Sequence, residues 1–292
     1  MEIGNWRATK ELNESFADIE RLGLERNALE LEAFGFTVIE NAISPDTVEA
    51  LRQGIFDALQ QRTGRRPDPD TGETHPELNM AHYLLFRGEA FEHAVLNERP
   101  LALITYLLGR SCLLSSMTSH VKGPGKRPLA LHSDNGNGIP SPFPAFAQVA
   151  NCNYVLSDYT RESGAFAVVP GSHRLCRHPV GPEVRLGGED GNPDAIPVEV
   201  PAGSAIVFHG NTWHGSYPRL TPGLRVNLAV YFCRRYLATQ ERFGSAVAAE
   251  DQIARLGPRF ARLMGSELTY GWGEEGPDMT RMGYEASRSQ HG

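Results

Sequence analysis

Hydrophobic residues follow two different periods along this chain, and the change between them separates an N-terminal part from a central part. From residue 10 to residue 34, apolar side chains recur every three or four positions among acidic ones, which predicts one or two amphipathic helices. Ser44 provides an N-cap and Pro45 a first helical position, so a helix should follow to about residue 61. Another helix is predicted over residues 100–108. Together these helices would form a layer that backs a sheet.

After residue 110 the pattern changes to short apolar or alternating runs bounded by Gly or Pro, which are typical of strands. Short strands at this spacing predict an antiparallel barrel or jelly roll, so the expected fold is mainly β with a helical layer. The predicted strands cover residues 112–121, 130–134, 149–156, 165–169, 198–200, 205–208 and 225–232.

The segments between and after these strands differ in character. Residues 62–79 are rich in Pro, Gly and charge, which predicts a loop. The irregular stretch 173–197 is expected to act as a lid over the barrel mouth, because long irregular loops in compact domains are usually functional. Residues 234–265 are predicted to form a closing helix, followed by a weakly structured tail. We expect one domain over residues 1–292.

Composition narrows the function classes. The chain is 40% hydrophobic and 22% charged, like an ordinary soluble globular protein, and no apolar run approaches the ~18–20 residues of a membrane span. A net charge of -7 argues against broad binding of nucleic acid. The four cysteines show no CxxC spacing, and the N-terminus has no apolar signal core. We therefore expect a cytoplasmic protein without nucleic-acid or membrane partners; its oligomeric state stays open.

Candidate metal ligands occur in the second predicted strand. His132 and Asp134 are two residues apart, so they would project from the same face of an extended segment. With a distant histidine, such as His214, they could supply the two-His, one-carboxylate set of non-heme Fe(II) oxygenases, which leaves coordination positions open. His209 competes with His214 for the third position.

Arg225 adds a requirement for an anionic partner in the site. A guanidinium suits a carboxylate better than an ammonium group does, and an isolated arginine inside an apolar barrel would be costly without an anionic partner. Arg225 thus favours a dicarboxylate co-substrate over other uses of a metal-binding barrel.

Several motifs occur together in a defined order: the His132-x-Asp134 pair, the Pro170-Gly171-Ser172-His173 block, the segment 203–216 that contains His214, and Arg225 eleven residues later. Over roughly residues 30–235, the chain resembles the phytanoyl-CoA dioxygenase family of Fe(II)- and 2-oxoglutarate-dependent oxygenases. Residues 236–292 would form a C-terminal helix and tail outside this core.

The resemblance implies a double-stranded β-helix core, of the jelly-roll or cupin-like type, with N-terminal and C-terminal helices. It places His132, Asp134 and His214 on iron, and Arg225 with Ser216 on the far carboxylate of 2-oxoglutarate. Asn153 falls where some family members carry an aromatic residue near the co-substrate, which leaves the contact to the iron-bound end of 2-oxoglutarate open.

The implied cofactors are Fe(II), 2-oxoglutarate and O2, and the implied reaction oxidises a C–H bond, mainly by hydroxylation, with release of succinate and CO2. Asp134 disfavours halogenation, because related halogenases carry a small residue there. The chain shows no Lys/Arg cluster for the phosphates of coenzyme A, so the expected substrate is a small or medium organic metabolite, as in secondary metabolism. Residues 135–144 should form part of its pocket wall.

Two other function classes remain to be weighed. One is a cupin-like metalloenzyme that does not use 2-oxoglutarate, and the other is a non-catalytic ligand-binding barrel, since this type of fold hosts many functions. Arg225 with Ser216 argues against the first class, and the complete ligand set argues against the second. His173 is expected to shape a loop, whereas the role of His120 stays open.

Overall fold

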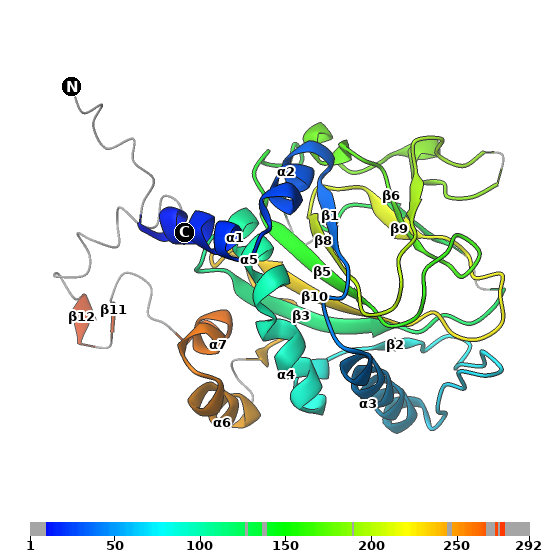
Figure 1. The fold of residues 1–292 in the computed structure, drawn as a ribbon, viewed down its shortest axis with the longest axis horizontal. Helices are drawn as coiled ribbons and strands as arrows, with labels where there is room; N and C mark the ends of the chain where they lie inside the picture. Colours follow the sequence, from blue (N-terminus) through cyan, green and yellow to red (C-terminus); the bar gives the residue numbers. More distant parts are fainter. Residues whose placement is uncertain are drawn as a thin grey trace.

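Two antiparallel sheets form the centre of the molecule in the computed structural model (Figure 1). The structure describes residues 10–125, 128–135, 139–188, 190–243, 247–266, 272–273 and 275–277. The larger sheet has the order β1(Phe36–Ile39), β8(Ala205–His209), β5(Val149–Val155), β10(Asn227–Cys233), β3(Leu113–His120) and β2(Met80–Ala81). The smaller sheet has the order β4(Leu129–His132), β9(His214–Ser216), β6(Phe166–Val168) and β7(Ile196–Val198). This arrangement confirms the predicted jelly roll with its helical layer.

The larger sheet has a different chemical character on each face, because strand side chains alternate in direction. In β10, Leu228, Val230 and Phe232 belong to the main apolar core, which the sheet shares with the helices. The intervening residues, Asn227, Ala229 and Tyr231, line a cavity on the other face. The face of this sheet that carries polar and small residues is therefore turned toward the smaller sheet.

Among the described residues, five α-helices precede β3 in the sequence: α1(Lys10–Arg21), α2(Glu25–Phe34), α3(Pro45–Thr63), α4(Glu89–Leu96) and α5(Glu98–Leu108). Gly23, with a φ of 64°, separates α1 from α2, so the predicted 10–34 segment forms two helices. The Ser44 hydroxyl accepts a 3.2 Å hydrogen bond from the Thr47 amide, which confirms the predicted cap of α3.

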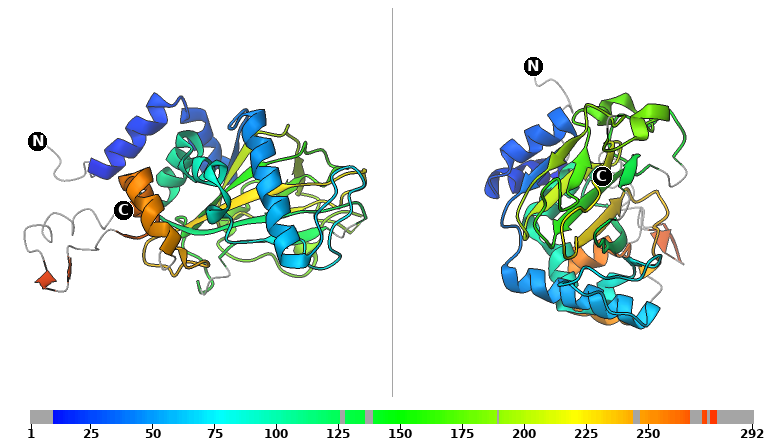
Figure 2. Two further views of the ribbon diagram at one scale, coloured as in Figure 1. Left: turned by 90° about the horizontal axis from the view of Figure 1, so that it is seen from below. Right: turned by 90° about the vertical axis from the view of Figure 1, so that its right-hand side faces the viewer.

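Helix α5 packs against β5 and β8, and the other helices lie beside it on the outer side of the larger sheet (Figure 2). Helix α4 and the preceding short 3-10 helix η1(Leu84–Arg87) were not predicted from the sequence. Within the part of the chain that the structure describes, no helix combines the length and apolar character needed to cross a membrane.

The prediction of one closing helix over residues 234–265 is wrong. Helices α6(Val247–Leu256) and α7(Pro258–Leu263) are separate, because Gly257 adopts a φ of 83° and Pro258 starts the second helix. Residues 234–243 are irregular and run beside β3. Of the tail, the structure describes a short pairing of β11(Trp272–Gly273) with β12(Gly276–Pro277), and the remaining predicted tail lies outside the described residues.

The stretch 173–197, predicted as a lid, contains parts of the short 3-10 helices η2(Ser172–Leu175) and η3(Gly181–Val184). None of its described residues lines the cavity between the sheets, so the lid prediction is wrong. Leu186 instead joins an apolar cluster with Ala167 and Trp213. Because Ala167 points away from its cavity-facing neighbour Phe166, this stretch covers the outer side of the smaller sheet.

Candidate metal and co-substrate site

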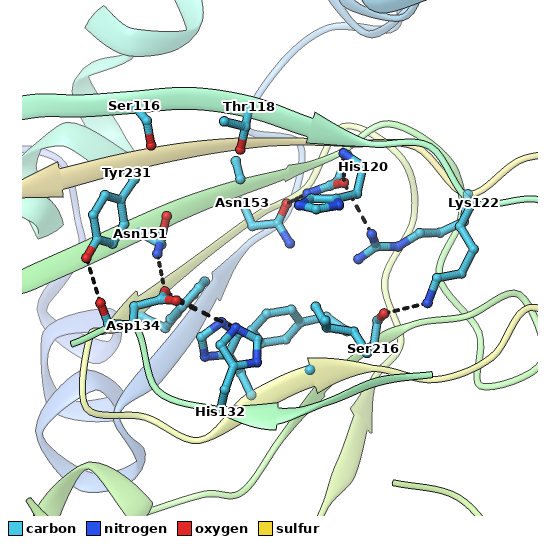
Figure 3. A pocket seen from close by; sticks show the side chains of 18 of the residues that line it. Ser116, Thr118, His120, Lys122, His132, Asp134, Asn151, Asn153, Ser216 and Tyr231 are labelled. Carbon is cyan, nitrogen blue, oxygen red and sulfur yellow. Dashed lines mark hydrogen bonds and ion pairs between the residues drawn. The ribbon is translucent and has the colours of Figure 1, made fainter. Parts of the chain in front are cut away.

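A cavity of about 320 Å³ lies between the two sheets (Figure 3). Its volume is at the lower end of the roughly 300–1,000 Å³ typical of small-molecule sites. The residues that line it are Asn79, Ser116, Thr118, His120, Lys122, Pro128, Leu129, His132, Asp134, Asn151, Asn153, Phe166, Phe208, His214, Gly215, Ser216, Arg225, Asn227, Ala229, Tyr231 and Gln240.

His132 and His214 lie side by side because β4 and β9 pair with these two residues opposite each other. Their ring centroids are 4.3 Å apart. Nδ1 of His132 lies 2.9 Å from the backbone oxygen of Ala130, and Nδ1 of His214 lies 3.0 Å from that of Thr212. With Nδ1–H donating to these carbonyls, both rings turn Nε2 toward the cavity, as metal-binding histidines do.

Asp134 completes this cluster from beyond the end of β4. The predicted strand over residues 130–134 ends at His132, so the two side chains do not share one strand face as expected. The chain bends instead, and the Asp134 amide donates to the backbone oxygen of Gly210 at 2.9 Å. The hydroxyl of Tyr231 donates to the Asp134 backbone oxygen at 2.8 Å, and Asn151 donates to its Oδ2 at 2.5 Å. Asp134 is thus held on three sides.

The three side chains fit a divalent metal such as Fe(II). Asp134 Oδ1 is 3.7 Å from Nε2 of His132, and its Oδ2 is 3.5 Å from Nε2 of His214. One ligand atom from each residue lies within 4.8 Å of the others. Burial lowers the pKa of His214 to about 4, although Asp134 acts in the opposite direction, so this ring is neutral and its nitrogen lone pair is free for a metal. Two imidazoles and one carboxylate on one side leave the opposite side open.

Gly215, between His214 and Ser216, allows β9 to approach β4 this closely. A Cβ at this position would collide with the backbone oxygen of Leu129. Strand β9 itself was not predicted, because three residues are too short to show an alternating pattern. The glycine after His214 was nevertheless visible in the sequence, and it marks a close backbone approach.

The far end of the cavity carries two buried cations, Arg225 and Lys122. Their backbones form an antiparallel bridge, with N–O distances of 2.9 and 2.8 Å. Lys122 Nζ donates to Ser216 Oγ at 2.8 Å, and Arg225 Nη1 donates to Asn227 Oδ1 at 3.2 Å. The Arg225 guanidinium also lies 4.9 Å from the centroid of the Tyr159 ring. Both cations and the predicted Ser216 therefore meet at one end of the cavity.

This end fits the carboxylate of a co-substrate such as 2-oxoglutarate. Arg225 is 4% exposed, and among the described residues its Nε has no hydrogen-bond partner. No acidic group perturbs Lys122; burial and then the charge of Arg225 lower the pKa of its amine to about 7. Two adjacent buried cations without an acidic partner are costly, and an anion placed between them would relieve both.

Lys122 was missed in the sequence, although a signal was present. It lies two residues after His120, and residues at this spacing share a strand face. His120, whose role the sequence left open, lines the cavity next to it. What the sequence could not show is that the continuation of β3 pairs with Arg225, which precedes the neighbouring strand β10.

Asn153 lies deep in the cavity wall. Its Oδ1 accepts a 2.9 Å hydrogen bond from Asn227 Nδ2, and Asn227 Oδ1 is bound by Arg225. The Asn153 amide nitrogen points into the cavity (Figure 3). A polar donor therefore lies on the same wall of the cavity as Arg225.

His173 and His209 form a second pair of close histidines, with ring centroids 5.5 Å apart, but neither lines the cavity. Nδ1 of His209 accepts from the Asn211 amide at 3.0 Å, and burial lowers the pKa of His209 to about 3. Of the two candidates for the third ligand, His214 is the one placed beside His132 and Asp134, whereas His209 packs in the protein interior.

The predicted wall from residues 135–144 is not found. Residues 136–138 lie outside the described part of the chain, and residues 135 and 139–144 do not line the cavity. The chain turns away after Asp134, as shown by the Phe143 amide, which donates to the backbone oxygen of Cys176 at 2.7 Å. The aromatic lining comes from Phe166, Phe208 and Tyr231 instead.

Comparison with known proteins agrees with this geometry. The model of the phytanoyl-CoA dioxygenase (PhyH) family matches residues 31–227. Dioxygenase af480 of Aspergillus fumigatus is 28% identical over 247 residues, which are 83% of this chain and 77% of that protein. An ectoine dioxygenase of Stutzerimonas stutzeri is 26% identical over 246 residues, covering 73% of this chain and 78% of that protein.

Solved structures show the same fold. HygX from Streptomyces hygroscopicus, crystallised with nickel and 2-oxoglutarate, superposes with a TM-score of 0.58 at 18% identity, covering 74% of this chain and 88% of that one. A further HygX structure also holds hygromycin B. EctD from S. alaskensis superposes with a TM-score of 0.56 at 20% identity, covering 75% of this chain and 79% of that chain.

Proposed function

The chain belongs to the phytanoyl-CoA dioxygenase family of Fe(II)- and 2-oxoglutarate-dependent oxygenases, and on this premise we propose how its residues divide the reaction. His132, Asp134 and His214 hold Fe(II). Arg225, Ser216 and, in addition, Lys122 hold the far carboxylate of 2-oxoglutarate. The amide nitrogen of Asn153 donates a hydrogen bond to the same molecule.

One observation carries this assignment: a three-ligand cluster and a pair of buried cations occupy separate places in one cavity. A molecule that chelates a metal at one end and carries a carboxylate at the other satisfies both places at once. 2-Oxoglutarate has this form. A cupin-like enzyme without this co-substrate would leave Arg225 and Lys122 buried without an anion.

Fe(II) together with 2-oxoglutarate and O2 supplies the oxidising chemistry, so that R–H, O2 and 2-oxoglutarate give R–OH, succinate and CO2. The contribution of the chain is positioning. Backbone carbonyls fix both histidine rings, and Asn151 fixes the orientation of the Asp134 carboxylate. Phe208 packs 4.5 Å from the His214 ring and Phe166 5.4 Å from it, which keeps water from that side of the metal.

The substrate we propose is a small or medium organic metabolite rather than a macromolecule. The cavity volume of about 320 Å³ and the net charge of -7 support this choice. Similar proteins point the same way, since HygX, which shares the fold, was crystallised with hygromycin B and a sequence relative is an ectoine dioxygenase. We also propose a cytoplasmic location, because all four cysteines are free thiols.

An anaerobic titration tests the assignment. Fe(II) and 2-oxoglutarate should together produce the visible charge-transfer absorption of the chelate in the wild-type protein, and neither should do so alone. His214→Ala should lose the band, whereas His93→Ala, which changes an exposed histidine of α4, should keep it. No band in the metal-loaded wild type would remove the 2-oxoglutarate assignment.

A further inference from the structure

We propose that the end of the cavity opposite Arg225 binds a neutral, hydroxyl- or amide-bearing part of the substrate, and that Gln240 is the residue that selects it. This inference rests on the proposed function, because it assigns the substrate to the same site. Figure 3 shows the division: Ser116, Asn151 and Tyr231 lie at one end, and Lys122 lies at the other.

Gln240 reaches the cavity from a segment that sequence reasoning assigned to a helix. Residues 234–243 follow β10 and lie beyond residues 31–227, which the family model matches. Gln240 lines the cavity, and its Oε1 accepts a 2.6 Å hydrogen bond from the hydroxyl of Ser116 on β3. A part of the chain outside the matched region thus completes the wall of the site.

The backbone around Gln240 is firmly attached to β3. The Gln240 amide donates to Ser115 Oγ at 3.0 Å, and the Glu241 amide donates to the Ser115 backbone oxygen at 2.8 Å. The Glu241 carboxylate, which is 5% exposed, accepts from the backbone amides of Tyr83 at 2.6 Å and Met117 at 2.8 Å. Gln240 is therefore held in position before any ligand binds, which favours selective recognition.

The groups around Gln240 are uncharged donors and acceptors. Ser116 and Thr118 contribute hydroxyls, Asn151 an amide and Tyr231 a phenol. Among the described residues that line the cavity, the side chains other than histidine that carry charge are Asp134, Lys122 and Arg225. In the proposed function the metal uses the first, and the co-substrate uses the two cations.

This distribution excludes three classes of substrate group from this end. A carboxylate would find no cation there, and an ammonium group would find only the carboxylate that the metal occupies. A hydrocarbon would displace water from these hydroxyls and amides and offer them no hydrogen bond in return. A neutral polar group can exchange hydrogen bonds with Gln240 and Ser116 instead.

Cavity size further limits the substrate. Co-substrate and substrate share about 320 Å³, so a small molecule, or only the reacting end of a larger one, can enter. Suitable probes are therefore small and matched in shape: cyclohexanecarboxamide, cyclohexanecarboxylate, cyclohexylamine and methylcyclohexane. They differ in polarity and charge on one ring.

The test uses the full chain loaded with Zn(II), which does not turn over, and 2-oxoglutarate, with probe binding measured by saturation-transfer NMR. The affinity for 2-oxoglutarate is measured first, because its absence would count against the proposed function and not against the role of Gln240. With co-substrate bound, the carboxamide should bind more tightly than the other three probes. Equal or tighter binding of the carboxylate or the hydrocarbon, or binding of no probe at millimolar concentration, would overturn the proposal.

Variants of Gln240 separate its role from general packing. Gln240→Leu should weaken carboxamide binding by about two- to tenfold, the worth of one hydrogen bond, and strengthen methylcyclohexane binding. Gln240→Glu keeps the shape and the acceptor for Ser116 and should shift preference to cyclohexylammonium, so it serves if the leucine variant fails to fold. Gln53 is exposed on α3, so Gln53→Leu should change the affinity for neither the carboxamide nor methylcyclohexane. Unchanged probe preferences in Gln240→Leu or Gln240→Glu would overturn the assignment.

Discussion

The two ends of the cavity share the same strands but differ in charge. Strand β10 contributes Asn227 at one end and Tyr231 at the other, and β3 contributes His120 and Ser116 in the same way. The cations are added just outside the strands, where Lys122 follows β3 and Arg225 precedes β10. The strands therefore supply a polar wall throughout, and the connecting segments decide which end carries charge.

This difference explains how one small cavity could bind the co-substrate and the substrate, each at its own end. An anion is favoured where Arg225 and Lys122 meet, and a neutral polar group is favoured beside Gln240. Among the proposed metal ligands, His132 lies between these ends, and Asp134 lies beside Asn151 and Tyr231 (Figure 3). Changes at one end should then alter one ligand and leave the other nearly unaffected.

Replacing Arg225 should have the largest effect. Arg225→Met should weaken 2-oxoglutarate binding by about 100-fold, because losing one partner of a buried charge pair costs about 2–5 kcal/mol and each 1.4 kcal/mol is about tenfold. Isothermal titration under anaerobic conditions measures this change. Arg219→Met is the matched control, since Arg219 is also buried but donates to the backbone oxygens of Ser163 and Pro222. Equal losses in both variants would contradict a specific carboxylate contact.

Replacing Asn151 should affect the metal most directly, because its amide donates to the Asp134 carboxylate. Asn151→Leu removes the 2.5 Å hydrogen bond that orients Asp134, and the loss of such an outer partner typically lowers metal affinity about 10- to 100-fold. Competition with a chromophoric chelator measures the affinity for Fe(II). Unchanged metal affinity in a folded variant would show that Asp134 does not depend on this contact.

Replacing Lys122 should have a smaller effect than replacing Arg225. Lys122→Met should weaken 2-oxoglutarate binding by about tenfold, the worth of one hydrogen bond to a charged group. The same titration measures it, with Lys10→Met in α1 as the control. If Lys122→Met binds 2-oxoglutarate as tightly as the wild type, the carboxylate contacts Arg225 alone.

The pH dependence should be the mildest effect and should also trace to Lys122. Burial lowers the pKa of this amine to about 7, so its charged form is lost as pH rises above that value. Because a carboxylate binds the charged form, the affinity for 2-oxoglutarate should be full below pH 7 and fall above it by no more than the roughly tenfold expected for Lys122→Met. The dependence should disappear in Lys122→Met; its persistence would assign it to another group.

Much of this site could be predicted from the sequence because its residues occur in local motifs. His214, Ser216 and Arg225 were predicted from the family resemblance that their motifs carry, and the alternating runs indicated the sheets. The position of Asp134 beyond β4 could not be read locally, because a bend held by Gly210 and Tyr231 replaces the expected strand.

The features that were missed depend on contacts between distant parts of the chain. The role of Lys122 in the site can be recognised only from its backbone pairing with Arg225, about a hundred residues later. The segment that carries Gln240 has a charged, alanine-containing composition that favours a helix, but Ser115 and Met117 hold it in an irregular path along β3. Tertiary hydrogen bonds there override local propensity.

A crystal structure of the anaerobic protein with Fe(II) and 2-oxoglutarate tests the central claim most directly. We expect His132, Asp134 and His214 on the metal, and the far carboxylate within hydrogen-bond distance of both Arg225 and Lys122. The end beside Ser116 and Gln240 should stay free of co-substrate. A carboxylate bound at that end, or a metal held by other residues, would contradict the account.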